Sequence, residues 1–296
     1  MDRLSTHSKR HSQIASAGKR TLMQNINLGR VLTYVFLILL ASVMLLPFLW
    51  MLSASLKLDK DVFRFPIEWI PAKPVWENYV TIWTQIPFLT FFANTFKLTF
   101  IITLLQLATS SFAAYAFAKL EFKGRNFLFL AYIASIAVPW QVYMVPQFIM
   151  MRQLGLVNNH LSLILLQAFS AFGVFLLRQF FISIPDEILD AARIDGMSEY
   201  GIYFRIMLPL SKPALATLTI FTAVFVWNDF MGPLIYLTSQ DLKTIQLGLR
   251  MFIQQYSTDY GLIMAAAIVS LIPVIVLFLA FQRFFVEGIG TTGTKG

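Results

Sequence analysis

The sequence predicts an all-α integral membrane protein with six transmembrane helices. Its 296 residues are 57% hydrophobic and only 13% charged, whereas soluble domains average roughly 45–50% apolar and about 25% charged residues. This chain has too few polar side chains to cover the surface of a water-soluble protein. Basic residues flank long uncharged stretches and do not gather on one face, so the formal net charge of +8 indicates membrane topology and no nucleic-acid partner.

Six stretches are long enough to cross a bilayer, whose core of about 30 Å needs around 20 apolar residues per helix. Five contain no Lys, Arg, Asp or Glu: 31–56, 98–118, 126–151, 153–177 and 260–282. The sixth, 213–240, has one acid, Asp229. An open sheet would leave unpaired backbone groups in hydrocarbon, so helices are expected.

Prolines lie inside or near the ends of these stretches, at Pro47, Pro139, Pro146, Pro233 and Pro273. In a helix bundle, neighbouring helices can satisfy the carbonyl groups that a proline leaves free. We therefore expect kinked helices, which are common beside a cavity.

The distribution of Lys and Arg predicts that both termini face the cytoplasm. With the N-terminus inside, only eight of the 23 basic residues fall in outer segments: Lys57, Lys60, Arg64, Lys73, Lys97, Arg152, Lys243 and Arg250. The remaining 15 lie in inner segments. This imbalance follows the positive-inside rule.

Residues 1–27 are predicted to be a disordered, basic cytoplasmic tail, and residues 28–296 to form one transmembrane domain. The tail resembles the first part of a signal peptide, but the apolar run after it is too long and no small-residue cleavage site follows. His7 and His11 have the spacing of a helical metal pair, yet no acid accompanies them. With no cysteine in the chain, no metal site is predicted.

The inner segment of about 182–212, between the fourth and fifth spans, is predicted to contain two short helices. Ser183 can cap the first helix, with Pro185 at an early position, and Gly196 can end it in a left-handed conformation. Ser198 is a plausible cap for the second helix, which is expected to end before Pro209. The segment would then form a compact inner loop.

Ile188, Ala191, Ala192 and Asp195 share one face of the first predicted helix, since they occupy positions i, i+3, i+4 and i+7. The small alanines leave room for another surface to approach closely, which favours a docking helix. Spacing alone is equally compatible with an amphipathic linker that lies on the membrane surface.

The residues Asp190-Ala191-Ala192, Asp195-Gly196, Ile206 and Leu208-Pro209 resemble the EAA loop of membrane subunits of binding-protein-dependent ABC importers. The first acid is Asp190, where the family usually has Glu. Residues 209–213 (PLSKP), 227–230 (WNDF) and 282–288 (QRFFVEG) resemble the carbohydrate-type branch, in particular the second permease of maltose-type systems. The resemblance covers residues 28–296 and implies a type I ABC importer permease fold.

The resemblance implies a multi-pass permease of the bacterial inner or plasma membrane that works with other subunits. These are a second, different permease, two ATP-binding subunits that hold ATP–Mg, and an extracellular solute-binding protein. The chain itself would bind no cofactor and carry no catalytic residue. The residues implied to couple it to the ATPase are Asp190, Ala191, Ala192, Asp195, Gly196, Ile206, Leu208 and Pro209.

The chain carries no nucleotide-binding signature of its own. Gly196 and Gly201 have the separation of a P-loop, but Ile202 and Tyr203 follow where Lys and Ser or Thr are required. Coupling to an ion gradient would need acids or bases inside the spans, which offer almost none besides Asp229. The energy for transport is therefore expected from a partner protein.

Polar and aromatic side chains within the spans are candidates for the substrate pathway: Asn94, Gln141, Gln167, Trp227, Asn228 and Asp229. Each also has a structural interpretation, since amides bond between helices and tryptophans anchor at membrane interfaces. Asp229 lies roughly 24 Å along the fifth span at 1.5 Å per residue, in its outer half. It could line the outer mouth or pair with a neighbouring subunit.

The sequence therefore favours a permease subunit that forms half of a pathway for a sugar or oligosaccharide. Alternatives are an importer permease for another polar solute such as glycerol phosphate, an ATP-independent secondary transporter, or a membrane scaffold without transport activity.

Overall fold

The computed structural model describes residues 28–253 and 259–290, and no β-strand occurs among them. The chain divides into two compact units, residues 1–53 and 54–296. The described part of the first unit is the beginning of helix α2 (Leu28–Ser55). The predicted tail, residues 1–27, lies outside the described residues.

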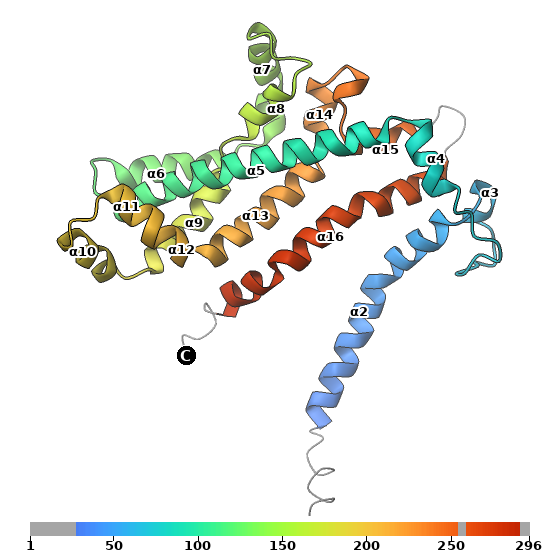
Figure 1. The fold of residues 1–296 in the computed structure, drawn as a ribbon, viewed down its shortest axis with the longest axis horizontal. Coiled ribbons are helices and arrows are strands. Elements are labelled where there is room, and N and C mark those ends of the chain that lie inside the picture. The colour runs from blue at the N-terminus through green and yellow to red at the C-terminus, as the bar shows by residue number, and fades with distance from the viewer. Residues whose placement is uncertain (1–27, 254–258, 291–296) are drawn as a thin grey trace, which may run out of the picture. The chain divides into compact units, whose positions relative to one another are not determined.

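The second unit contains the remaining helices, which Figure 1 shows in chain order. Its long or span-forming helices are α5 (Phe88–Lys119), α6 (Arg125–Ala134), α7 (Trp140–Gln153), α8 (His160–Gln167), α9 (Ala171–Ser183), α13 (Lys212–Trp227) and α16 (Tyr260–Gly290). Shorter helices connect them: α3 (Asp59–Val62), α4 (Asn78–Gln85), α10 (Asp186–Ile194), α11 (Glu199–Ile202), α12 (Leu208–Leu210), α14 (Met231–Tyr236) and α15 (Ile245–Met251).

The number of spans agrees with the sequence when each bent helix pair is counted once. Four stretches are long and apolar enough to cross a membrane as they stand: 29–55, 88–119, 160–183 and 260–284. Two further pairs of helices, 125–137 with 140–153 and 199–210 with 212–227, pass the same test but bend sharply at a short break, which brings the possible total to six. The first half of the second pair comes from the segment predicted to be the inner loop, and residues 228–240 of the predicted fifth span are not part of it. The predicted all-α membrane fold is confirmed.

The third predicted span, 126–151, is divided at Pro139. The segments 125–137 and 140–153 meet at an angle of 98°. Val138 adopts an extended conformation and Pro139 caps the second segment, because a residue before proline avoids the helical region. Pro146, by contrast, lies within α7 without ending it.

The fourth predicted span, 153–177, is wrong in register, since the observed helical stretch is 160–183. Left-handed residues at Gly155 and Asn158 end α7 and turn the chain first. At the other end, Arg178 does not stop α9. Its guanidinium lies 4.0 Å from the Phe129 ring centroid, and its Nε donates to the Phe117 carbonyl at 3.1 Å, so the charge is accommodated.

The fifth predicted span, 213–240, is also broken. Helix α13 ends at Trp227, and α14 begins at Met231. The Asn228 side chain donates to the Val224 carbonyl at 2.8 Å, while an Asp229 oxygen accepts from the Gly232 amide at 3.0 Å. These two side chains satisfy backbone groups on either side of the break, as helix caps do.

The prediction that the second loop helix ends before Pro209 is wrong. A π-helical segment, Tyr203–Met207, follows α11 and leads directly into α12, which contains Pro209. A proline in a regular helix clashes with the carbonyl four residues earlier. The wider π turn relieves that crowding, so the chain remains helical up to Leu210.

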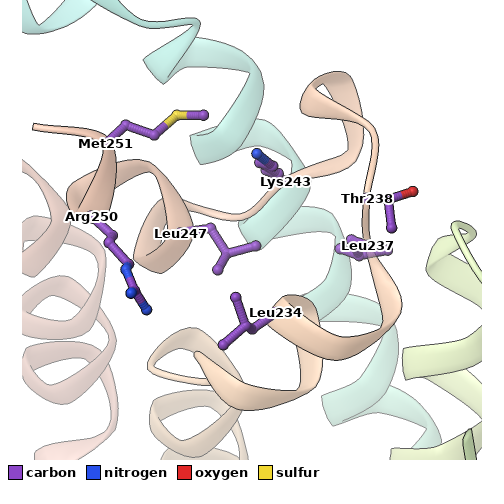
Figure 2. A pocket seen from close by; sticks show the side chains of 7 residues that line it. All are labelled: Leu234, Leu237, Thr238, Lys243, Leu247, Arg250 and Met251. Atoms are coloured by element: carbon purple, nitrogen blue, oxygen red, sulfur yellow. The ribbon is translucent and has the colours of Figure 1, made fainter. Parts of the chain in front are cut away.

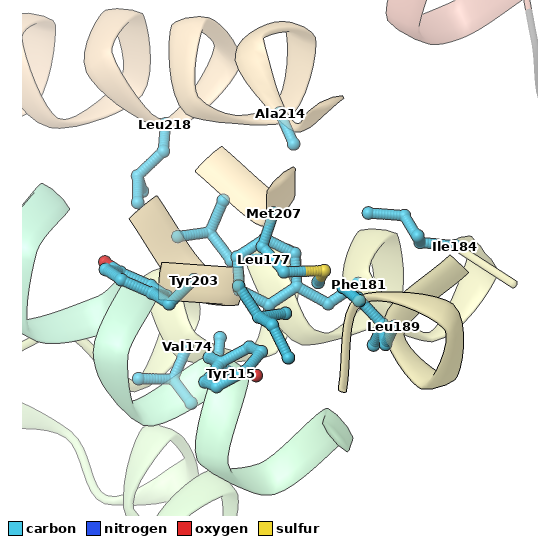
Figure 3. Close-up of a cluster of buried hydrophobic side chains, with 13 residues drawn as sticks. Tyr115, Val174, Leu177, Phe181, Ile184, Leu189, Tyr203, Met207, Ala214 and Leu218 are labelled. Atoms are coloured by element: carbon cyan, nitrogen blue, oxygen red, sulfur yellow. The ribbon is translucent and has the colours of Figure 1, made fainter. Parts of the chain in front are cut away.

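Helix α5 is central to the second unit, where it packs along α9 and α13, while α16 packs against α13 (Figure 1). A cluster of buried side chains joins α5, α9 and α13 to the loop between α9 and α13 (Figure 3). Leu177, Phe181, Met207 and Leu218 are each fully buried in it. This cluster holds the inner loop against the membrane-spanning helices.

Candidate coupling loop and pathway residues

The inner loop contains two helices joined by a tight turn at Gly196. Helix α10 has its acids Asp186 and Glu187 in the first turn, where they favour the helix dipole. Gly196 has φ +79°, a conformation that glycine adopts without steric cost. The Ser198 hydroxyl caps α11 by accepting from the Gly201 amide at 3.2 Å, as the sequence predicts.

The predicted cap at the start of the first loop helix is wrong, because Ser183 remains in α9. Its hydroxyl donates to the Phe180 carbonyl at 2.7 Å, so it is not available to the next helix. Pro185 takes the capping position of α10 without a side-chain hydrogen bond.

The outward face of α10 differs by one residue from the predicted one. Ala192 is only 6% exposed, because it packs with Leu189 on the inner cluster. Ile188, Ala191 and Asp195 do face outward, and Ile194 joins them with 86% of its surface exposed. Ile194 was missed because the i, i+3, i+4 pattern does not show which edge of a stripe is covered.

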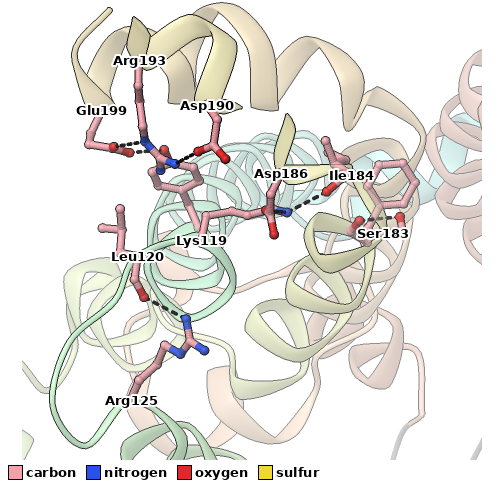
Figure 4. Close-up of polar contacts among 11 residues, drawn as sticks. Lys119, Leu120, Arg125, Ser183, Ile184, Asp186, Asp190, Arg193 and Glu199 are labelled. Atoms are coloured by element: carbon pink, nitrogen blue, oxygen red, sulfur yellow. Dashed lines mark hydrogen bonds and ion pairs between the residues drawn. The ribbon is translucent and has the colours of Figure 1, made fainter. Parts of the chain in front are cut away.

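Polar contacts tie both loop helices to each other and to the inner end of α5 (Figure 4). Arg193 donates to Glu199 through Nε and to Asp190 through Nη1, each at 2.8 Å. The Tyr115 hydroxyl on α5 donates to the other oxygen of Glu199. Hydrogen bonding from Arg193 first, and from Tyr115 second, holds the pKa of the Glu199 carboxyl below its usual value.

Lys119, the last residue of α5, makes a second connection to the loop. Its side chain is 3% exposed, and its amine donates to Asp186 Oδ1 and to the Ile184 carbonyl, both at 2.6 Å. A buried ammonium needs such partners. The start of α10 is therefore fixed to α5 as well.

The remaining predicted coupling residues lie on the second half of the loop. Ile206 and Leu208 are half-buried against the inner cluster, whereas Pro209 is exposed. These three residues belong to the helical segment 203–210 and do not share the outward face of α10.

The predicted pathway residues do not converge on one site in this chain. Asn94 donates to the carbonyl groups of Asp241 and Lys243 at 2.7 and 3.0 Å, which ties α5 to the segment between α14 and α15. Gln141 is exposed on α7. Trp227 is buried, and its Nε1 donates to the Ser270 carbonyl at 3.0 Å.

Asn228, Asp229 and Gln167 lie at the break in the fifth span. Gln167 Nε2 donates to Asp229 Oδ2 at 2.8 Å, which connects α8 to the segment before α14. Asn228 is exposed, and its side-chain oxygen accepts from Gln246 at 3.4 Å. Of the predicted pathway residues, Gln141 and Asn228 are the ones whose side chains face outward.

An open pocket of about 380 Å³ lies between α14 and α15, at the outer end of the predicted topology (Figure 2). Leu234, Leu237, Leu247 and other apolar residues form its wall, and Lys243 and Arg250 bring two cations to it. Among the described residues, neither cation forms an ion pair. The sequence predicts both residues on the outer side but did not show that they line one pocket with Leu234 and Leu237.

A helical membrane bundle with a two-helix inner loop is the arrangement expected of importer membrane subunits, or permeases. Residues 106–290 match the family described as "Binding-protein-dependent transport system inner membrane component". The chain belongs to this family, and it is a permease subunit of an ABC importer.

Two curated relatives are transport permeases of similar length. The chain is 36% identical over 260 residues to the arabinooligosaccharides transport system permease protein AraQ of Halalkalibacterium halodurans, covering 87% of this chain and 93% of that protein. It is 34% identical over 267 residues to the sn-glycerol-3-phosphate transport system permease protein UgpE of Salmonella typhi, covering 88% and 95%.

A solved structure has the same fold. It is a chain of a bacterial ABC transporter involved in the import of the acidic polysaccharide alginate. The TM-score is 0.77 at 25% sequence identity, and the match covers 88% of this chain and 98% of that one.

Proposed function

We propose that this permease forms half of the translocation pathway for a sugar or oligosaccharide and is driven by ATP bound to other subunits. The observation that carries the proposal is the inner loop, whose helix α10 presents Ile188, Ala191 and Ile194 outward from a base fixed to the membrane helices. Relatives named as permease proteins of arabinooligosaccharide and lactose transport systems support a carbohydrate.

The partners in this proposal are two ATP-binding subunits, a second and different permease, and an extracellular solute-binding protein. ATP–Mg binds to the ATP-binding subunits, and this chain binds no cofactor. Among the described residues the candidates for the pathway do not converge on one site, which supports a second permease that completes the pathway. Both termini lie in the cytoplasm, on the side of the ATPase.

In the proposed mechanism, α10 docks into a cleft on an ATP-binding subunit, with Asp190, Ala191, Asp195 and Gly196 at or beside the contact. Closure of the ATPase pair on ATP displaces α10. The displacement tilts the fourth and fifth spans, so the central cavity alternates between inward and outward opening. Ile206, Leu208 and Pro209 support the loop during this movement.

The test is co-purification of the chain with its ATP-binding subunits, followed by uptake measurements in proteoliposomes. We expect a stable complex whose uptake requires both ATP and the solute-binding protein. Uptake by the permease without ATPase subunits would instead show a secondary transporter, and a complex with no uptake under any condition would indicate a scaffold.

A phosphate- or carboxylate-bearing solute is a second candidate, and the pocket with Lys243 and Arg250 favours it. Two cations without acidic partners in a partly apolar pocket suit an anionic group next to a carbon skeleton. Calorimetric titration of the associated solute-binding protein with arabinooligosaccharide and with glycerol 3-phosphate separates the candidates. Exclusive binding of glycerol 3-phosphate would overturn the carbohydrate assignment and leave the importer assignment intact.

A further inference from the structure

One face of α5 contacts the inner loop, between α9 and α13, along the last turns of the helix. Ser111, Phe112, Tyr115 and Lys119 are spaced so that they lie on this face. Ser111 and Tyr203 share a hydrogen bond of 2.6 Å between their hydroxyl groups. The Phe112 ring stacks on Tyr203 with centroids 4.5 Å apart. Ser111 and Phe112 therefore both contact Tyr203 of the loop. The other two residues of this face, Tyr115 and Lys119, hold α10.

Helix α10 is held by α5 at both ends. At its start, Lys119 binds Asp186 and the Ile184 carbonyl. At its end, Tyr115 binds Glu199, which in turn binds Arg193 of α10. A helix attached at both ends cannot shift relative to α5 unless one of these connections breaks.

We propose that Tyr115 and Lys119 are positioning residues that make the second span, α5, move together with α10 when ATP binds to the partner subunits. This inference rests on the proposed function, in which α10 docks on an ATP-binding subunit. It adds a third moving span, since the loop joins only the fourth and fifth spans through the chain itself. Movement of α10 then reaches the outer end of α5 because one continuous helix, Phe88–Lys119, connects the two sides.

The Tyr115→Phe variant separates this role from simple stabilisation of the fold. The ring stays in the inner cluster, where Tyr115 is 5% exposed, so packing is preserved. Glu199 is partly exposed, with 43% of its side chain accessible, so water replaces the lost hydroxyl. The variant is therefore expected to fold and assemble.

The experiment measures the movement of α5 directly in the assembled importer with its solute-binding protein. Because the chain contains no cysteine, nitroxide labels can be placed at Phe96→Cys on α5 and Leu45→Cys on α2, both exposed positions, with cysteine-free partner subunits. Helix α2 is chosen as the reference because α16 packs against α13 of the fifth span, which is proposed to move. Pulsed electron resonance then gives the distance between the labels without nucleotide and with Mg²⁺ and the ATP analogue AMP-PNP.

We expect the distance to change on AMP-PNP binding in the wild-type complex. In Tyr115→Phe and Lys119→Met, the equilibrium between the two distance populations should shift about 2- to 30-fold toward the nucleotide-free state. The matched control is Tyr236→Phe, which removes the hydroxyl of another buried tyrosine on α14 and should behave as wild type.

Several results would overturn the inference. The first is a wild-type distance that does not change with AMP-PNP, and the second is a pair of variants with wild-type distance populations. The third is that the variants form no complex, because the contacts would then only stabilise the fold. Failure of the proposed function is distinguishable, because the wild-type chain would then bind no ATP-binding subunit. An assembled, nucleotide-responsive wild-type complex with unaffected variants refutes only the role of α5.

Discussion

Gly196 determines the path of the chain between the two loop helices. Its φ of +79° lies in the left-handed region, yet a Cβ added there would meet no atom within 4 Å. Any cost of substitution is therefore backbone strain and not steric contact with a neighbour. Gly155, between α7 and α8, has φ +69° and equally open surroundings, so the two glycines form a matched pair.

Replacing Gly196 by Val should destabilise the turn by about 1–2 kcal/mol and reduce ATP-dependent uptake. Gly155→Val should cost a similar amount in thermal stability, because the strain is the same, but should leave uptake per assembled complex unchanged. Thermal unfolding and proteoliposome uptake check the two effects. Equal uptake by both variants would contradict a coupling role for this turn.

Glu199 should make the stability of the loop depend on acidic pH. Its pKa is lowered from 4.5 in the folded protein, first by the hydrogen bond from Arg193 and then by that from Tyr115. Asp190 is the other carboxylate that accepts a hydrogen bond from Arg193. The stabilisation is present above pH 4.5 and is lost as the pH falls through the lower folded-state pKa. Between pH 7 and 3.5, the unfolding temperature should therefore fall less in Glu199→Gln than in the wild-type protein. An equal fall in both proteins would contradict the role of Glu199.

At the scale of the element, the broken fifth span shows how polar side chains replace helical hydrogen bonds inside a membrane protein. Asn228 and Asp229 satisfy backbone groups on both sides of the break. The sequence contained both residues, but a polar side chain within an apolar stretch does not show whether the helix breaks there. Pro139 lies at the break of the third span, since proline restricts the residue before it. Pro47, Pro146 and Pro273, which were expected to kink their helices in the same way, lie inside continuous helices.

Trp227 tests whether the end of α13 serves packing or substrate. It is 4% exposed, and its ring meets Phe92 edge-on at 5.4 Å. Trp227→Ala should lower the free energy of unfolding by about 3–5 kcal/mol, while Trp76→Ala, at an exposed tryptophan, should have little effect. Trp227→Phe should keep the KM for uptake; a large rise in KM without loss of thermal stability would instead indicate substrate contact.

At the scale of the whole molecule, the proposed assembly uses an apolar surface that is exposed among the described residues. Ile194 on α10 is 86% exposed, and Ile70 in the segment between α3 and α4 is 87% exposed. The two isoleucines have nearly equal exposure, but the proposed topology places them on opposite sides of the membrane.

Ile194→Glu should abolish co-purification with the ATP-binding subunits, because it puts a charge into the proposed contact. Ile70→Glu should not affect it. Both variants should retain the thermal stability of the isolated chain, since neither side chain is buried. Retention of the ATPase by Ile194→Glu would show that α10 does not form the docking surface.

The sequence alone determined the membrane environment, the helical class and the inner loop. Hydrocarbon excludes charge and unpaired backbone, so long uncharged stretches must be helices. Gly196 and Ser198 determine the turn and the cap of the inner loop through their own backbone and side chain. The tertiary structure decided where two spans break, which edge of α10 is covered, and which side chains meet. Tyr115 and Glu199, or Lys119 and Asp186, come together only because packing of distant helices sets their separation, and no local pattern encodes such contacts.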